Sequence, residues 1–298
     1  MRDNPMAWDE EEGPDGVLSP FGEDDPLNDK SETLRLLGLP TETNIKRPDQ
    51  VTTSEDTSPA VYAVLQEISK ALTVAIADNK GSRIELDHLS EAERVQLFDA
   101  LGEGEVLIVL SGGVDGEADA RIQETVLAGV WRGEASSSDG SVTTYWIETA
   151  DAPRAVRRAS AERSTLQLDI ASIEPPRGAM NVMGVLSEIE AKSAEWRPEQ
   201  ENHVLNFTLF PMTPADSAFL SQTLSEVGIQ IISGGYGIAR VIKTAVPHVW
   251  AVQFLNGMGT TILDTIEIGD LPGSVLASRE DFEDSATRLA EISGAYAS

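Results

Sequence analysis

The sequence predicts an α+β protein made of two homologous lobes, each a helix, a strand and a helix followed by an antiparallel strand meander. Side chains recur at a constant spacing of 119 residues, because Arg121 and Trp131 correspond to Arg240 and Trp250 without a gap. The apolar pattern changes from helical to alternating in the same order in each half. Only turn-length segments separate the later strands, and such connections join antiparallel neighbours rather than parallel crossovers.

The repeat extends to both sides of this segment. Downstream, an I-E-x-x-D-x-P pattern occurs at 147–153 and again at 266–272. Upstream, with small insertions, Val64-Leu65 corresponds to Val185-Leu186. Because chance rarely aligns so many positions, we expect an internal duplication.

Helices are predicted where apolar residues recur at spacings of three and four and where capping residues mark a start. Residues 59–78 have this spacing. Ser90 and Glu93 form a capping-box pattern that begins a helix ending near Leu101, and a short helix is expected from Pro153.

The second half repeats the start of its second helix with different residues. Thr213 is the expected N-cap, Pro214 takes the first helical position, and Asp216 places an acid in the first turn. The same element order is therefore expected in both lobes.

Strands are predicted by alternating or β-branched apolar runs bounded by Gly and Ser clusters. A short strand lies around Ile84, and longer runs cover 105–110, 120–132 and 142–149. The longest run contains Gly129 where the second copy has His248 after Pro247. Since Pro cannot donate to a central ladder, a bulge, bend or break is expected at both places.

These patterns divide the chain into an acidic arm at 1–58, a first lobe at 59–165, a linker at 166–177 and a second lobe at 178–298. The arm holds 15 Asp and Glu, 5 Lys and Arg and 6 Pro without a sustained apolar period, so it is expected to be mostly disordered. We interpret the arm as a passive, solubilising tail, since charge runs are usually solvated. The alternative is that an apolar patch in it, formed by Leu34, Leu36, Leu37 and Leu39, docks on a partner or on the domain itself.

Composition excludes several classes of function. The 298 residues carry a formal charge of −28, which disfavours nucleic acid and anionic membranes as partners. The chain has no cysteine, so disulfides, thiolate metal sites and cysteine nucleophiles are excluded. The N-terminal residues lack the pattern of a secretory signal, and no aliphatic run is long enough to span a bilayer, so a cytoplasmic protein is expected.

The duplicated carboxylates are the best candidates for acid–base or metal chemistry. Glu148 and Asp151 recur as Glu267 and Asp270. A reaction centre is seldom needed twice in one chain, so we interpret each Asp as the N-terminal cap of the helix that follows. Arg121 and Arg240 are expected to pair across strands with Glu148 and Glu267, respectively. The alternative is a metal site built from Glu267, Asp270 and His248.

Other conspicuous residues have structural interpretations. Trp131 and Trp250 are expected to anchor the cores, although paired aromatics also line ligand clefts. The loop 233–237 is expected to be a hairpin turn rather than a phosphate site. Arg154, Arg157, Arg158 and Arg163 either bind an acidic partner or complement the end of their own helix.

Many short ordered motifs resemble the HupH/HyaF hydrogenase expression proteins. In the second lobe they are His203-Val-Leu-Asn-Phe-Thr-Leu, Pro211-Met-Thr-Pro-Ala-Asp216, Gly235-Tyr-Gly237, His248-Val-Trp250, Thr265-Ile-Glu267 and Glu280-Asp-Phe-Glu-Asp-Ser285. In the first lobe they are Leu101-Gly-Glu-Gly-Glu-Val106, Ile122-Gln-Glu-Thr-Val and Gly129-Val-Trp131-Arg132. The resemblance covers about 60–295. It implies an accessory protein of nickel-iron hydrogenase maturation that acts on the small-subunit precursor, and no catalytic residue or cofactor is carried over.

The sequence therefore predicts a non-enzymatic scaffold or chaperone that binds the hydrogenase small-subunit precursor, together with other maturation proteins, through a groove between the lobes or a lobe face. The expected contacts are Tyr236, His248, Trp250 and Phe254. A metallochaperone or metal-dependent enzyme is the alternative, and a homodimeric module with a deep apolar pocket is a third.

Overall fold

The computed structural model describes residues 58–78, 80–112, 117–137, 141–208, 210–234, 237–256 and 261–296. Residues 1–57 of the predicted arm and Tyr236 lie outside these residues. The first half contains α2 (Pro59–Asp78), β1 (Ser82–Glu85), α3 (Glu91–Leu101), β2 (Val106–Ser111), β3 (Glu117–Glu124), β4 (Val130–Ser137), β5 (Thr143–Thr149) and α4 (Arg154–Arg163). The second contains the 3₁₀ turn η3 (Ile170–Ser172), α5 (Val182–Glu195), β6 (His203–Asn206), α6 (Pro214–Leu224), β7 (Glu226–Ser233), β8 (Ile238–Thr244), β9 (Val249–Leu255), β10 (Thr261–Ile268), the 3₁₀ turn η4 (Gly273–Val275) and α7 (Arg279–Tyr296).

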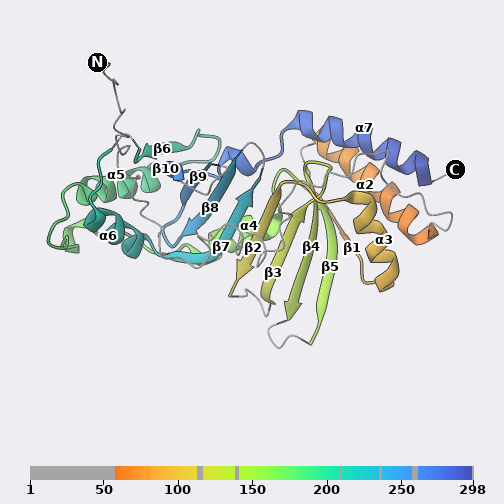
Figure 1. Ribbon diagram of the computed structural model, residues 1–298, viewed down its shortest axis with the longest axis horizontal. Helices are drawn as coiled ribbons and strands as arrows, with labels where there is room; N and C mark the ends of the chain where they lie inside the picture. Colours follow the sequence, from red (N-terminus) through yellow and green to blue (C-terminus); the bar gives the residue numbers. More distant parts are fainter. Residues whose placement is uncertain are drawn as a thin grey trace, which may run out of the picture.

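The strands form one antiparallel sheet in the order β1-β5-β4-β3-β2-β7-β8-β9-β10-β6. This confirms the α+β class, and each half contributes an antiparallel meander (Figure 1). The strand order is symmetric about the middle of the sheet. Counted inward from one edge, the first half contributes β1, β5, β4, β3 and β2; counted inward from the other edge, the second half contributes the corresponding strands β6, β10, β9, β8 and β7. The halves join where β2 pairs with β7, with Ile108 opposite Ile231. They therefore share a single sheet instead of forming two separate lobes with a groove between them.

Both predicted helix starts are confirmed, because side chains satisfy backbone N–H groups that have no partner within the helix. The Glu93 N–H donates to Ser90 Oγ (3.3 Å), and the Ser90 N–H donates to the Glu93 carboxylate (2.9 Å). Thr213 and Asp216 make the same reciprocal pair at 3.1 and 2.9 Å, with Pro214 at the first helical position.

The predicted strand over 120–132 is two strands, β3 and β4, connected by a turn. The expected interruption is at Gly129, whose φ of 78° lies in the left-handed region, and His248 at the equivalent place has a φ of 61°. Sequence patterning missed the second strand because Val126 and Leu127 in the turn are apolar and continue the run.

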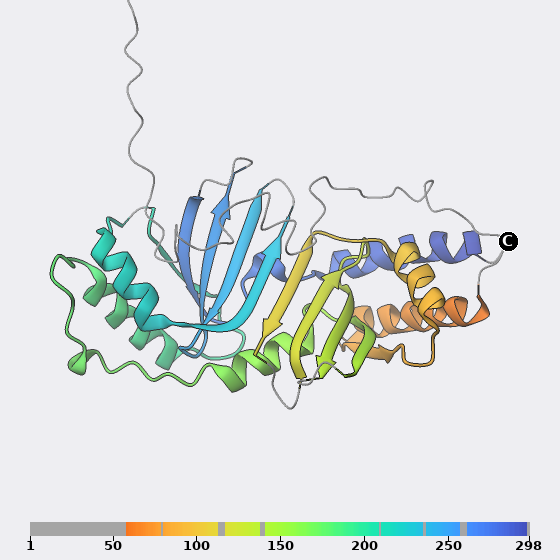
Figure 2. The same ribbon diagram turned by 60° about the horizontal axis from the view of Figure 1, so that its bottom comes forward.

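Two helix groups pack on the same face of the sheet at its opposite ends (Figures 1 and 2). Helices α2, α3 and α7 close a core with Val130 and Ile147, and α5 and α6 close another with Ile242 and Ile266. The opposite face carries a third core around Trp131 and Trp250, covered by α4 and η4. As expected, both tryptophans are buried core residues.

Helix α7 follows the strands of the second half in sequence, but it packs on the core of the first half. It packs along α2, and its residues Phe282, Leu289 and Ile292 belong to the first-half core. Helix α2 is long and apolar enough to cross a membrane by length and composition. Its apolar side is buried in this core, while Glu67 and Lys70 face outward, so packing accounts for its apolarity.

Candidate functional site

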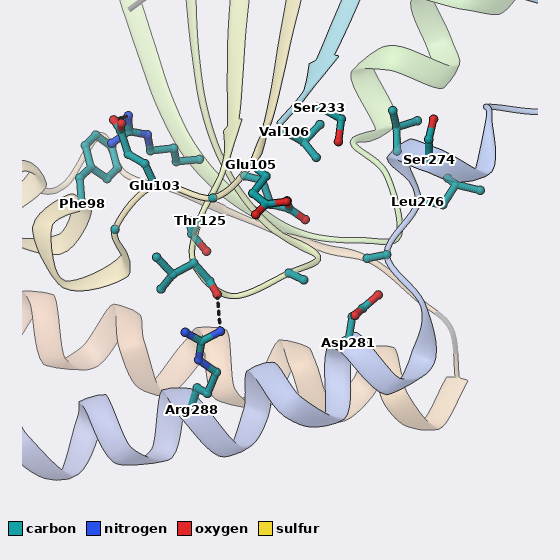
Figure 3. A pocket seen from close by; sticks show the side chains of 18 of the residues that line it. Phe98, Glu103, Glu105, Val106, Thr125, Ser233, Ser274, Leu276, Asp281 and Arg288 are labelled. Carbon is teal, nitrogen blue, oxygen red and sulfur yellow. Dashed lines mark hydrogen bonds and ion pairs between the residues drawn. The ribbon is translucent and has the colours of Figure 1, made fainter. Parts of the chain in front are cut away.

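A cleft of about 650 Å³ opens at one end of the central strands, where the two halves meet (Figure 3). It lies between the end of α3, the start of β2, the 125–129 turn and the chain leading from η4 into α7. Its lining residues are Phe98, Asp99, Gly102, Glu103, Gly104, Glu105, Val106, Glu124, Thr125, Val126, Ala128, Arg132, Ser233, Ser274, Val275, Leu276, Ala277, Asp281 and Arg288.

The sequence forms this cleft by placing glycines where two chain segments come close together. Gly102 ends α3 with a φ of 61°, and its N–H donates to the Phe98 carbonyl (2.8 Å). A Cβ on Gly104 would overlap the Thr125 carbonyl, so only glycine fits there. The Gly104 N–H donates to the Glu124 carbonyl (2.8 Å) and fixes this wall against the turn.

Helix α7 forms the other wall. Its start is capped because Asp281 N–H donates to Ser278 Oγ (3.2 Å) and Ser278 N–H donates to the Asp281 carboxylate (2.7 Å). One turn further along α7, Ser285 Oγ donates to the Ala128 carbonyl (2.9 Å), and about one turn beyond that Arg288 donates to the Val126 carbonyl (3.0 Å). The C-terminal helix is thus hydrogen-bonded to a turn of the first half.

Carboxylates dominate the charge of the cleft. Burial raises the pKa of Glu124 to about 7, although its oxygen accepts the Gly129 N–H (3.1 Å); the nearby charges of Asp281 and Glu105 raise it further. Both arginines in the lining are engaged within the chain, since Arg132 pairs with Glu103 and Arg288 holds the turn. The cleft is therefore suited to a positively charged group, which would restore the ionised form of Glu124.

The second half has the opposite charge at the position equivalent to Glu124. Lys243, 119 residues later, is fully buried, and its Nζ donates to the carbonyls of Thr244 (3.0 Å), Val246 (2.7 Å) and Val249 (3.0 Å). It lies 5.3 Å from the Trp250 ring centroid. Burial lowers the pKa of Lys243 to about 7.

Helices also fix the two turns in equivalent ways. Ser285 of α7 donates to the Ala128 carbonyl, and Ser193 of α5 donates to the Pro247 carbonyl (2.7 Å), at equivalent positions. The Trp196 ring stacks on His248 with centroids 4.2 Å apart. This contact occupies one face of the imidazole, whose pKa is lowered by burial.

The structure separates those predicted partner contacts that it describes. Tyr236 is outside the described residues. His248 lies at the β8–β9 turn, whereas the half-buried Phe254 lies near the other end of β9 and packs on the central core. Trp250 is only 2% exposed, so a direct contact of this side chain with a partner is corrected to a core role.

The predicted helix caps are wrong. Neither Asp151 nor Asp270 caps a helix, because α4 and η4 have Pro153 and Pro272 at their N-cap positions without a side-chain hydrogen bond. Instead Arg157 bridges both aspartates, at 2.6 Å from Asp151 and 2.9 Å from Asp270. The duplicated acids thereby tie the two halves together.

The predicted arginine pairs are also wrong. Glu148 accepts hydrogen bonds from the backbone and side chain of Arg154 (both 3.0 Å), not from Arg121. Arg121 lies opposite Glu134 on β4. Glu267 accepts from Asn202 Nδ2 (3.1 Å), and Arg240 lies opposite Gln253, whose neighbour on β10 is Asp264 rather than Glu267.

The alternative metal site is not assembled. Glu267 is bonded to Asn202, Asp270 to Arg157, and His248 is stacked on Trp196. In the part of the chain that the structure describes, no group of three or more His, Cys, Asp or Glu is placed to hold a metal ion.

Three of the four helix arginines act within the protein. Arg154 and Arg157 form the ion pairs described above, and Arg163 donates to the carbonyls of Ser111, Val227 and Gly228 at the β2–β7 junction. Arg158 is exposed. Arg154, Arg157 and Arg163 therefore stabilise the protein's own fold, and their contacts do not require an acidic partner.

Known proteins match both halves of the chain. A family model described as the HupH hydrogenase expression protein, C-terminal conserved region, matches residues 60–168 and 179–296. The hydrogenase expression/formation protein HupH of Rhizobium leguminosarum bv. viciae is 42% identical over 235 residues, which are 78% of this chain and 81% of that relative. The hydrogenase-1 operon protein HyaF of Escherichia coli K12 is 31% identical over 236 residues, 79% of this chain and 81% of its own. A solved structure of the hydrogenase expression protein HupH from Thiobacillus denitrificans is 30% identical and covers 39% of this chain and 98% of that chain, with a TM-score of 0.33.

Proposed function

This chain belongs to the HupH family of hydrogenase expression proteins, and on that premise we propose that it binds the small-subunit precursor of a nickel-iron hydrogenase while the iron-sulfur clusters of that subunit are assembled. The observation that carries the proposal is the family match to both halves of the chain. This match agrees with the resemblance to the HupH/HyaF hydrogenase expression proteins that the short sequence motifs indicate. In this proposal the protein is a scaffold and not an enzyme, and it acts in the cytoplasm.

The charge of the chain supports a basic partner surface. The formal charge is −28, and complementary charge speeds encounter between proteins. In the cleft, burial raises the pKa of Glu124, and the charges of Asp281 and Glu105 raise it further. A lysine or arginine of the precursor placed there would relieve this repulsion, so we place part of the partner interface at the cleft.

Two of the contacts expected from the sequence remain in the proposal. His248 is half-buried at the β8–β9 turn, where its ring stacks on Trp196, and Phe254 is half-buried at the opposite end of the hairpin. Tyr236 stays a sequence-based expectation. Because these residues are at different ends of the strands, they would belong to separate parts of one broad interface.

We also infer that the halves descend from one duplicated unit. Its support is the recurrence of side chains at a spacing of 119, the symmetric strand order and the two segments matched by one family model. Superposition of the described parts of 59–163 and 182–282 tests it: equivalent strands should overlay with Trp131 on Trp250. A different strand register would contradict the inference.

The experiment is co-purification with a tagged small-subunit precursor from cells that make the hydrogenase. The parent chain should be recovered with the precursor and absent from a pull-down of the mature subunit. Glu105→Gln combined with Glu124→Gln should reduce recovery at least threefold, with a smaller loss at high salt because the charge attraction is screened.

A matched control pair is Glu162→Gln with Asp284→Asn, which likewise replaces two carboxylates by amides, at exposed positions outside the cleft. No recovery of the precursor, together with normal hydrogenase activity in a deletion strain, would contradict the proposed function. Equal recovery with both variant pairs would retain the function and reject the cleft as its interface.

A further inference from the structure

The two halves of the sheet have the same register near the cleft, so backbone positions there can be matched between them. Val109 on β2 lies opposite Arg121 on β3. Ile232 on β7 lies opposite Arg240, the residue equivalent to Arg121. Val109 therefore corresponds to Ile232, which is 123 residues later.

The same spacing of 123 holds where the helices before these strands end. The Val126 N–H donates to the Leu101 carbonyl at the end of α3 (3.0 Å), and the Ala245 N–H donates to the Leu224 carbonyl at the end of α6 (3.0 Å). Val126 and Ala245 are equivalent positions of the two turns. Because the spacing is the same on both sides, the residues between Leu101 and Val109 have equivalents in the second half without a gap.

In the second half, a guanidinium group lies at the place equivalent to part of the cleft. Arg163 Nη1 donates to the carbonyls of Val227 (3.1 Å) and Gly228 (3.3 Å) on β7 and to that of Ser111 (2.6 Å) at the end of β2. The first-half equivalents of these three residues are Gly104, Glu105 and Gly234. The first two line the cleft, and the third follows Ser233, which lines it too.

The first half has a phenylalanine where the second half has Arg163. Counted from the equivalent Pro153 and Pro272, Arg163 corresponds to Phe282. The Phe282 side chain packs in the core with α2 and does not supply a cation to the cleft. The place that a guanidinium fills in one half is therefore part of an open cleft of about 650 Å³ in the other.

The first half also adds carboxylates at this place. Glu105 corresponds to Gly228, and Glu124 corresponds to Lys243. Figure 3 shows Glu105 and Asp281 in the cleft, the latter on the α7 wall. The cleft thus has the backbone positions that hold a guanidinium in the second half, together with negative charge that the second half lacks at the positions of Glu105 and Glu124.

The cleft carbonyls equivalent to those that hold Arg163 have capacity for a further donor. The Gly104 carbonyl accepts from Gln123 Nε2 (3.1 Å), and the Glu105 carbonyl accepts the Gly234 N–H (2.8 Å). Since a carbonyl oxygen has two lone pairs, each of them has room for a second hydrogen bond.

We propose that the cleft binds the guanidinium group of an arginine side chain from a partner protein, at the end of the β2–β7 pair opposite to the end that holds Arg163. Naming the hydrogenase small-subunit precursor as the source of this arginine rests on the proposed function. Arginine fits better than lysine, because its planar fork presents five N–H donors to several acceptors and is less strongly hydrated than an ammonium. Charge-assisted hydrogen bonds to Glu105 and Glu124 add to those from the carbonyls.

The test measures binding of three capped pentapeptides to the full chain at pH 8, where most of Glu124 is ionised. The peptides have glycine and serine around one central residue, which is arginine, lysine or the uncharged citrulline. Titrations followed by amide chemical shifts give affinity and location together. The arginine peptide should shift the signals of 102–106 and 124–129 and bind roughly fivefold more tightly than the lysine peptide, and the citrulline peptide should not bind.

Two pairs of substitutions locate the site. Glu105→Gln combined with Glu124→Gln should weaken binding of the arginine peptide roughly tenfold, because the charged acceptors are lost. The control pair Glu162→Gln with Asp284→Asn, outside the cleft, should leave the affinity unchanged. Glu105→Gln alone, at an exposed position, repeats the measurement if the double variant fails to fold.

Several results would overturn the proposal. They are absence of binding, equal affinities for the arginine and lysine peptides, shifts that map away from the cleft, and equal losses of affinity in the two variant pairs. Recovery of the precursor without peptide binding rejects the arginine site and leaves the proposed function standing. Peptide binding without recovery of the precursor retains the site and rejects the precursor as the source of the arginine.

Discussion

Glu124 and Lys243 occupy equivalent positions in the two halves, 119 residues apart, and have opposite charges. Each lies under a turn of similar backbone, in which Thr125 Oγ1 contacts the Leu127 carbonyl (3.2 Å) as Thr244 Oγ1 contacts that of Val246 (3.4 Å). Lys243 fixes its turn from within by donating to three carbonyls. Glu124 accepts a single N–H, and α7 donates to the carbonyls of the first turn from outside. Both groups have pKa values of about 7 through burial, which shifts acids and bases in opposite directions.

We expect Glu124→Gln to become more stable relative to the parent as pH rises. The folded parent retains a proton on Glu124 that the unfolded chain has lost between pH 4.5 and about 7, so its stability falls across that window. The amide keeps an acceptor for the Gly129 N–H. The difference in unfolding free energy should grow by about 2 kcal/mol between pH 5 and pH 8. Urea titrations of both proteins measure it, with Glu162→Gln as control; a constant difference would contradict the expected burial of Glu124.

Lys243→Met should show the opposite trend at higher pH. The unfolded lysine keeps its proton up to about pH 10.5, while the folded group loses it near pH 7, so the parent gains stability as pH rises from 7. The variant lacks this gain. Its stability relative to the parent should fall by about 2 kcal/mol between pH 7 and pH 9. Lys192→Met, at a half-exposed position on α5, should show no such trend. A flat difference for Lys243→Met would mean that the carbonyl partners of Lys243 keep it charged.

Arg163→Met should weaken the junction between the halves. Its Nη1 donates to the Ser111 carbonyl (2.6 Å) on β2 and to those of Val227 (3.1 Å) and Gly228 (3.3 Å) on β7. Loss of these bonds should reduce the unfolding free energy by about 1–2 kcal/mol. Arg158→Met on the same helix is exposed and should change it by less than about 0.5 kcal/mol. Equal effects of the two substitutions in urea titrations would show that the bonds are unimportant.

Gly129→Ala should detach α7 from the first half. The residue has a φ of 78°, and a Cβ there would lie 2.5 Å from Phe282 Cε1. Strain and overlap together should reduce the unfolding free energy by about 2 kcal/mol or more, and amide hydrogen exchange should accelerate along α7. Gly273→Ala adds a Cβ with no neighbour within 4 Å and should leave both measurements unchanged. Unaltered exchange in the Gly129 variant would contradict the packing of Phe282.

Local patterning predicted the elements that depend on nearby residues. The helix from Pro59 to Asp78, the helix starts at Ser90 and Thr213 and the strand interruptions at Gly129 and His248 follow from spacing and turn chemistry within a few positions. The pairing of β2 with β7 was not predicted, because their contact joins residues more than 100 positions apart and has no local sequence signal.

The candidate site was missed for a related reason. The cleft is formed by α7 crossing to the first half, and periodicity alone does not say which half a C-terminal helix packs against. One signal was present in the repeat alignment: Glu124 stands where Lys243 stands, inside an otherwise matched segment. The helix-cap prediction for Asp151 failed because Arg157, one turn along α4, is a stronger partner for its carboxylate than backbone N–H groups.

The position of α7 has a consequence for synthesis on the ribosome. Phe282, Leu289 and Ile292 are translated more than 200 residues after α2, yet they fill the same core as this helix. Domains generally fold as they emerge, N-terminal part first. Here the N-terminal half must wait with an unfinished interior until translation reaches residues 279–296, whereas the C-terminal half can pack α5 and α6 earlier. Nascent chains are therefore most in need of protection at α2, whose apolar side stays uncovered until α7 has been made.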